Sequence, residues 1–379
     1  MQQYKQEWFG NIRGDILAGI VVCLALFPEV IGFMIVAGVP PIVGVYATFF
    51  ITAIAAFFGS SKGMISAAAG SVALVLAHLV AEYGIQYLFA ATILAGILQV
   101  ALGLLKVGTL MRYIPKPVMT GFVNGLGIMM FTSQLDHFQG SLLLPLLGLL
   151  GIAIIFLFPR ITKKIPAPIV AILVITAIVL GFGLDVKTLG DMGSISTDLP
   201  RFGIPAVPMT VETLRIIFPT ALSVAIVGLV ESLLTAQLVD EITEEKSDKN
   251  QETLSQGLGN VVSGFFGGIA GCGMIGQTII NLNYGGLGRL ATFLSGFFML
   301  LSVVLLNGAV VQIPVVALAA VMVVVSIETI NWDSIKCLRT NPKNESFAMI
   351  LTVAIVIGTH NLAYGVVAGT LVSAIFAAF

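Results

Sequence analysis

Charged residues are scarce in this 379-residue chain. Only 10% of its residues are Asp, Glu, Lys or Arg, whereas soluble domains carry about 25%. Apolar residues make up 58%, and the mean hydropathy is +1.05. A chain with so few charges lacks the polar surface of a soluble protein. We therefore expect it to lie in a lipid bilayer almost from end to end.

Other features that are rare or absent exclude several classes of function. The 18 basic and 19 acidic residues give a net charge of -1, so we expect no nucleic-acid partner. The three cysteines, Cys23, Cys272 and Cys337, have no metal-ligand spacing and suggest no disulfide framework. The chain has no P-loop, nucleotide-binding glycine pattern or metal-ligand cluster, and no visible pairing of a nucleophile with a base. These absences argue against an ATP-driven pump, an enzyme and a bound cofactor.

Long apolar runs, by contrast, occupy most of the chain. A membrane-spanning helix needs about 20 mostly apolar residues. We predict seven spans before a polar stretch at 184–210 and seven after it, which makes an all-α polytopic membrane protein with a short N-terminal segment, 1–13, and a transmembrane domain, 14–379. The expected spans are 14–37, 40–58, 64–81, 85–108, 114–133, 141–158, 166–183, 211–239, 253–270, 272–284, 286–307, 313–327, 344–359 and 361–379.

The basic residues suggest an orientation. With the N-terminus in the cytosol and alternation at each span, most Lys and Arg residues fall on the cytosolic side, and only Lys187, Arg201 and Arg215 fall outside. This bias predicts a multi-pass protein of the inner (plasma) membrane with both termini cytoplasmic. The charged segment 240–253 is then expected to be a solvated cytosolic connector.

Seven spans in each half give the halves opposite orientations, which is the inverted repeat of many secondary transporters. The third segment, 59–79, and the tenth, 267–286, are both short and glycine-rich, and each is third in its half. Helices that begin inside the membrane expose N–H groups and partial positive charge, which together suit an anion. The alternative is a pair of glycine-rich packing surfaces. The expected donors are Gly70 and Ser71 in the third segment and Gly273, Met274, Ile275, Gly276 and Gln277 in the tenth. We expect Ala69, just before Gly70, to contact the substrate as well.

Two carboxylates lie deep in apolar runs, at corresponding positions of the two halves. Glu29 follows Pro28 in the first span, and Glu231 lies in the eighth with Thr235 four residues on and therefore on the same helix face. Charged residues in spans are costly and usually functional, and these could carry H⁺ or bind Na⁺. Alternatively they are structural ties between helices. Phe33, one turn after Glu29, could wall the site or simply pack.

Several stretches resemble the SulP family of anion transporters, bacterial relatives of the mammalian sulfate, chloride and bicarbonate exchangers. They are NIRGDILAGI (11–20), PEVIGFMIVAGVPPIVGVYATFF (28–50), ISAAAGS (65–71), VESLLTAQLVD (230–240) and QGLGNVVSGFFGGIAGCGMIGQT (256–278). The resemblance covers essentially the whole chain, and the last two stretches are its most specific parts.

The resemblance implies a uracil-permease-like fold in which a core domain moves against a gate domain in an elevator-like cycle. The core would hold spans 1–4 and 8–11, about 14–108 and 211–307, and the gate spans 5–7 and 12–14, about 114–183 and 313–379. The anion would bind between the third and tenth helix ends, beside Glu29 and Phe33. It also implies a homodimer, and a role for Glu231 and Thr235 like that of the residues that hold Na⁺ in a bicarbonate-transporting branch.

The chain also departs from the family. Ala69 and Ile275 stand where the Na⁺-dependent branch has threonines, and Gln277 stands near the place of an arginine in animal exchangers. The loss of a hydroxyl ligand disfavours Na⁺ and favours H⁺ as the coupling ion. Relatives usually continue into a cytosolic STAS domain, whereas this sequence stops after its last span, so we expect a membrane domain without STAS.

Together these features predict a secondary active transporter of a small anion, with bicarbonate, sulfate and a dicarboxylate all open. We expect H⁺-coupled symport by an elevator mechanism. The alternatives are a Na⁺-coupled anion symporter, a nucleobase–cation symporter of the same fold and an uncoupled anion channel. The nucleobase alternative is disfavoured because 272–284 contains no carboxylate to bind a base, and two buried carboxylates argue against a passive channel.

Overall fold

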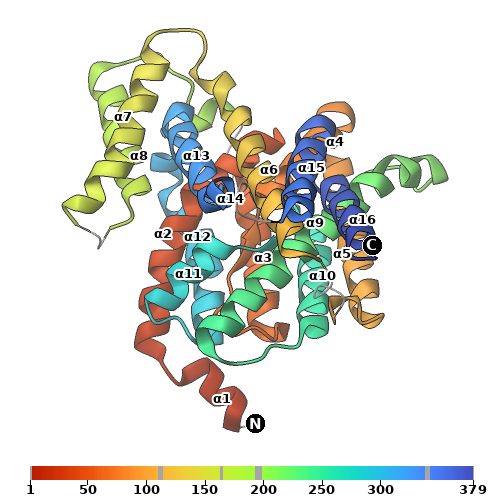
Figure 1. Ribbon diagram of the computed structural model, residues 1–379. Helices are drawn as coiled ribbons and strands as arrows, with labels where there is room; N and C mark the ends of the chain where they lie inside the picture. Colours follow the sequence, from red (N-terminus) through yellow and green to blue (C-terminus); the bar gives the residue numbers. More distant parts are fainter. Residues whose placement is uncertain (1, 110–113, 163–164, 193–198, 338–341, 379) are drawn as a thin grey trace.

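The computed structural model describes residues 2–109, 114–162, 165–192, 199–337 and 342–378. Helices dominate it (Figure 1), and it also has two three-residue strands. Phe379 and four basic residues used for the orientation, Arg112, Lys163, Lys164 and Arg339, lie outside the described residues. In chain order the elements are α1 Gln2–Phe9, α2 Ile12–Ala37, α3 Pro41–Phe58, β1 Ser66–Ala68, α4 Gly70–Tyr83, α5 Ile85–Leu104, α6 Lys116–Gln134, η2 Leu135–Phe138, α7 Leu143–Leu157, η3 Phe158–Arg160, α8 Ala167–Phe182, η4 Leu189–Met192, α9 Val211–Thr243, α10 Lys249–Phe265, β2 Gly271–Gly273, α11 Ile275–Asn283, α12 Arg289–Val310, α13 Val315–Thr329, α14 Trp332–Cys337, α15 Lys343–Thr359 and α16 Leu362–Ala378.

Each expected span overlaps one helix, or one strand followed by a helix. The first seven are α2 to α8, and the second seven are α9 to α13, α15 and α16. By length and composition alone, six described helices can cross a membrane, in Ile12–Ala37, Pro41–Phe58, Ile85–Leu104, Leu143–Arg160, Val211–Thr243 and Arg289–Val310. Four more apolar helices are shorter: α4, α8, α13 and α16. The third and tenth helices are short because a strand replaces the first part of each.

Turn residues set several helix ends. Proline stands in the first turn of α3, α6 and α8, where its missing N–H would have no intrahelical partner. Gly38 and Gly183 close α2 and α8 in the left-handed conformation, at φ values of 70° and 60°. The first span thus ends and the second begins within the short sequence around Gly38 to Pro41, which allows the two helices to pack side by side.

The strands β1 and β2 join the two halves of the chain. They pair antiparallel, with Ser66 opposite Gly273 and Ala68 opposite Gly271, and all their residues are buried. A Cβ at Gly271 would lie 2.1 Å from the Ala67 carbonyl oxygen, so only glycine allows this approach. The Asn260 side chain on α10 completes the pairing, because it accepts from the Gly271 N–H at 2.8 Å and donates to its carbonyl at 3.1 Å. Each strand leads directly into a helix, α4 or α11.

The helices pack in two groups. In the core bundle, α2, α3, α4 and α5 contact α9, α10, α11 and α12; in the gate bundle, α6, α7 and α8 contact α13, α15 and α16. Figure 1 shows α7 and α8 as a pair at one side of the molecule, next to α13. The bundles meet where α13 packs on α2, α6 on α4 and α16 on α9. Their movement as separate domains stays a prediction.

The connector 240–253 is less solvated than expected. Glu252 is only 1% exposed, and its carboxylate accepts hydrogen bonds from the backbone N–H groups of Ser60 at 2.8 Å and Ser61 at 3.0 Å and from the Gln256 amide at 3.0 Å. Asp248 caps the N-terminus of α10. The expectation of a purely solvated connector is therefore wrong at Glu252, which holds the loop that leads into β1.

Candidate functional site

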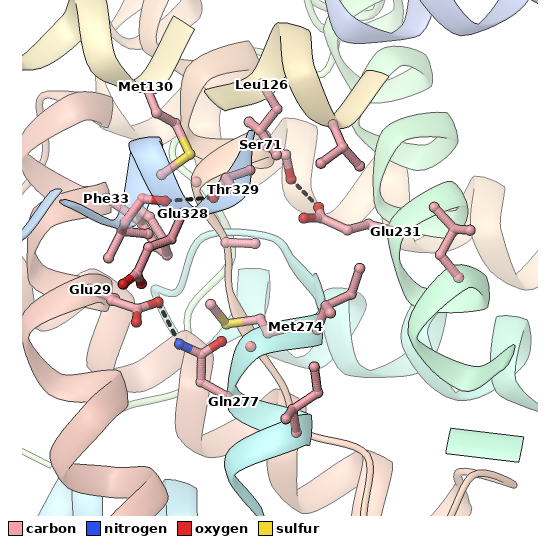
Figure 2. Close-up of a pocket in the computed structure, with 18 of the residues that line it drawn as sticks. Glu29, Phe33, Ser71, Leu126, Met130, Glu231, Met274, Gln277, Glu328 and Thr329 are labelled. Carbon is pink, nitrogen blue, oxygen red and sulfur yellow. Dashed lines mark hydrogen bonds between the residues drawn. The ribbon is translucent and has the colours of Figure 1, made fainter. Parts of the chain in front are cut away.

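A cavity of about 390 Å³ lies where the core and gate bundles meet. The core side comes from α2, α4, α9 and α11, and the gate side from α6 and α13 (Figure 2). Of the ten residues expected to bind substrate, nine line this cavity: Glu29, Phe33, Ala69, Gly70, Ser71, Met274, Ile275, Gly276 and Gln277. Glu231 lines it too, whereas Gly273 and Thr235 lie behind the wall.

Two helix N-termini open onto the cavity. The α4 helix begins at Gly70 and α11 at Ile275, and the N–H groups of a first helical turn have no intrahelical partner. Two of the expected donors are already used, because Gly273 N–H donates to the Ser232 hydroxyl at 2.8 Å and Met274 N–H to the Ile65 carbonyl at 2.8 Å. The backbone donors of the tenth segment therefore start at Ile275.

Glycine at position 70 is required by its neighbours. A Cβ at Gly70 would lie 2.7 Å from Cε1 of Phe33 and 3.2 Å from Cε of Met130. The Phe33 ring is buried and packs against the first turn of α4. Phe33 is thus a wall of the cavity next to one of its two helix ends.

Glu29 projects from the middle of α2 into the cavity. Its Oε2 accepts a hydrogen bond from the Gln277 amide at 2.5 Å, which joins the first span to the N-terminal turn of α11 (Figure 2). The α2 helix continues through Pro28, and because proline has no N–H, the carbonyl four residues earlier lacks its usual donor. The neighbourhood of Glu29 thus combines a carboxylate with a locally weakened helix.

Glu231 projects from α9 and contacts Ser71, in the first turn of α4, and Cys272, in β2. Its Oε2 accepts a hydrogen bond from the Ser71 hydroxyl and another from the Cys272 thiol at 3.0 Å. Thr235, although on the same face of α9, donates instead to the carbonyls of Glu231 at 2.8 Å and Gly273 at 3.2 Å. The hydroxyl of Thr235 therefore braces β2, while the Glu231 carboxylate meets the cavity.

Glu328 and Thr329 also line the cavity, and the sequence interpretation missed both. They form the end of α13 in the gate bundle, just beyond the expected span end at residue 327. In the cavity the Glu328 carboxylate points towards that of Glu29 (Figure 2). The sequence feature that could have indicated them is a carboxylate beside a hydroxyl at the end of an apolar run. Charged residues are common at the ends of spans, so this feature alone does not predict a site.

The charge of the cavity wall is one-sided. Three carboxylates line it, those of Glu29, Glu231 and Glu328, and no Lys, Arg or His is among the described residues of the lining. Partial positive charge comes only from the helix N-termini and from side-chain donors such as the Gln277 amide. The arrangement suits an anion held by backbone N–H groups, provided that part of the carboxylate charge is neutralised.

The sequence matches the model of the sulfate permease family over residues 12–143 and 141–354. The chain belongs to this family. The putative sulfate transporter YbaR of Bacillus subtilis is 54% identical over 375 residues, which cover 98% of this chain and 78% of the relative. The bicarbonate transporter BicA of Synechocystis is 30% identical over 395 residues, which cover 94% of this chain and 68% of the relative.

Two solved transporter structures superpose closely on this chain. The transmembrane domain of a cyanobacterial bicarbonate transporter BicA superposes with a TM-score of 0.83 at 26% identity, over 96% of this chain and 98% of that one. SLC26A9 superposes with a TM-score of 0.83 at 20% identity, over 96% and 65%. The predicted fold, a mostly helical membrane protein with a seven-plus-seven inverted repeat, is confirmed. This sulfate permease family member is a polytopic anion transporter, and its relatives are transporters rather than enzymes.

Proposed function

We propose that this family member is a proton-coupled symporter of a small oxyanion, with sulfate and hydrogencarbonate as the first candidates. The observation that carries the proposal is the cavity where two helix N-termini meet three carboxylates. Helix N-termini bind anions through backbone N–H groups and the helix dipole. The names of the relatives, a putative sulfate transporter and a bicarbonate transporter, support these two anions.

The charge of the wall favours coupling to a cation. An anion that enters beside three carboxylates is repelled unless part of their charge is neutralised. With no basic side chain among the described lining residues, the neutralising charge comes from an ion that travels with the substrate. This argument favours symport over an uncoupled channel.

The surroundings of Glu231 favour H⁺ over Na⁺. Sodium is a hard cation and prefers several oxygen ligands, yet Glu231 is met by the Cys272 thiol, a soft group, and by one hydroxyl, that of Ser71. Ala69 and Ile275, at the helix ends nearby, offer no side-chain oxygen. A proton needs only the carboxylate itself, so we assign it to Glu231, with Glu29 as a second carrier.

The placement of the cavity suits an elevator movement. The helix ends and two of the carboxylates belong to the core bundle, whereas Phe122, Leu126, Met130 and Glu328 cover them from the gate bundle. Sliding of the core bundle against this cover would carry the anion and its proton across the membrane together. In the orientation expected from the basic residues, with both termini cytoplasmic, the Glu328 end of α13 faces the cytosol. A homodimer, as the family resemblance implies, completes the proposal.

Uptake into proteoliposomes tests this function. Labelled sulfate, hydrogencarbonate and a dicarboxylate are each offered under two conditions. In the first, the proton concentration is higher outside the liposomes and Na⁺ is absent. In the second, the Na⁺ concentration is higher outside and the pH is the same on both sides. We expect accumulation of at least one anion under the pH gradient alone. Accumulation that requires Na⁺ at constant pH refutes proton coupling, and equilibration without accumulation under either gradient indicates a channel.

A further inference from the structure

Glu328 differs from the other two carboxylates of the cavity in its origin and its surroundings. It belongs to the last turn of α13 in the gate bundle, whereas Glu29 and Glu231 belong to the core bundle. Its side chain is exposed, whereas the other two are only partly accessible. Glu328 therefore faces the anion site from the opposite side of the bundle boundary.

The other two carboxylates have hydrogen-bond donors, and Glu328 has none among the described residues. The Gln277 amide donates to Glu29, and Ser71 and Cys272 donate to Glu231. The Glu328 carboxylate points towards that of Glu29, and both line the cavity (Figure 2). Because solvent reaches the Glu328 side chain, its charge costs less than a charge on an enclosed carboxylate.

We propose that Glu328 is a charge-specificity residue, which selects singly charged over doubly charged anions by placing a negative charge on the gate side of the cavity. The inference rests on the proposed anion site. Repulsion by one fixed charge is proportional to the charge of the anion, so a divalent anion loses twice as much binding free energy as a monovalent one. Loss of the Glu328 charge therefore favours every anion but favours divalent anions more.

Anion binding by the purified protein measures this selectivity. The thermal unfolding midpoint in detergent is titrated with sulfate and with hydrogencarbonate at pH 8, in buffer whose other anions are large and organic, and each titration yields an apparent dissociation constant. For Glu328→Gln we expect the affinity for sulfate relative to hydrogencarbonate to rise about tenfold or more, because a unit charge within about 12 Å of the anion contributes about 1.4 kcal/mol or more per unit of anion charge at an effective dielectric constant of about 20. Glu328→Asp keeps the charge and should keep the ratio near that of the wild type.

Glu345→Gln is the matched control, since it removes an exposed glutamate from α15 that does not line the cavity. Its ratio should equal that of the wild type. The proposal is overturned if a folded Glu328→Gln variant, one that elutes from a size-exclusion column like the wild type, has an unchanged ratio of sulfate to hydrogencarbonate affinity. If that variant does not fold, Glu328→Ser removes the same charge and is judged by the same ratio. A changed ratio without uptake in liposomes refutes only the transport function, whereas a wild type that binds neither anion overturns the charge-specificity proposal and leaves the transport function to the uptake assay.

Discussion

The Gln277 amide donates a 2.5 Å hydrogen bond to the Glu29 carboxylate, and this contact joins residues 248 positions apart in the chain. It brings the middle of α2, the first span, to the N-terminus of α11. A carboxylate beside an anion-binding helix end must be held in place and partly compensated, and the amide does both. The contact is therefore the natural first target for mutation.

Replacement of Gln277 by alanine should weaken anion binding about tenfold or more. A hydrogen bond to a charged group contributes about 1.5–3 kcal/mol, and its loss leaves Glu29 without that donor at the anion site. The measurement is the apparent dissociation constant of the anion in detergent. Gln139→Ala removes a similar 3.0 Å amide–carboxylate contact, to Asp136, on the exposed surface, and should leave binding unchanged. Equal binding by wild type and Gln277→Ala would refute this role of Gln277.

A methyl group at Gly70 should disturb the cavity wall. The new Cβ would meet the Phe33 ring at 2.7 Å, and overpacking of this kind costs about 1–3 kcal/mol. We expect Gly70→Ala to lower anion affinity, and the double variant Gly70→Ala/Phe33→Leu to recover part of it because the ring is gone. Gly308→Ala on α12 has open space around its Cβ and should behave like the wild type. Undiminished binding by Gly70→Ala would contradict the close packing of Phe33 on this helix end.

Glu252→Gln should destabilise the protein although position 252 is far from the anion in the proposed mechanism. The carboxylate accepts from two backbone N–H groups and from Gln256, and a glutamine would turn one acceptor into a donor that faces other donors. The expected loss is about 1–3 kcal/mol, visible as a lower thermal midpoint in detergent. The exposed Glu345→Gln should unfold at the wild-type temperature. Identical midpoints for both variants would show that the Glu252 contacts contribute no stability.

Much of the cavity follows from the sequence because the membrane makes polar residues conspicuous. Glu29 and Glu231 stand out in apolar runs, and the glycine-rich third and tenth segments mark helices that begin inside the membrane. The structure places both helix ends and both carboxylates around one cavity. These features depend on local composition and on the position within each half, and both can be read along the chain.

Contacts between distant segments could not be predicted in the same way. The pairing of Glu231 with Ser71 and Cys272 depends on how α4 and β2 pack against α9, and sequence spacing carries no information about that packing. Glu328 stands at the end of a span, where a charge usually meets water, so its position on the cavity is a tertiary feature. The burial of Glu252 could not be predicted either, because Glu252 belongs to a charged segment whose composition is typical of a solvated loop.

Proton movement that accompanies anion uptake tests the central claim most directly. Liposomes that contain a pH-sensitive dye, with equal pH on both sides, no Na⁺ and a clamped membrane potential, receive an inward gradient of sulfate or of another transported anion that does not itself buffer the lumen. With the wild type the lumen should acidify as the anion enters, and with a folded Glu231→Gln variant this acidification should be abolished. Sustained anion entry through the wild type without acidification would contradict proton symport.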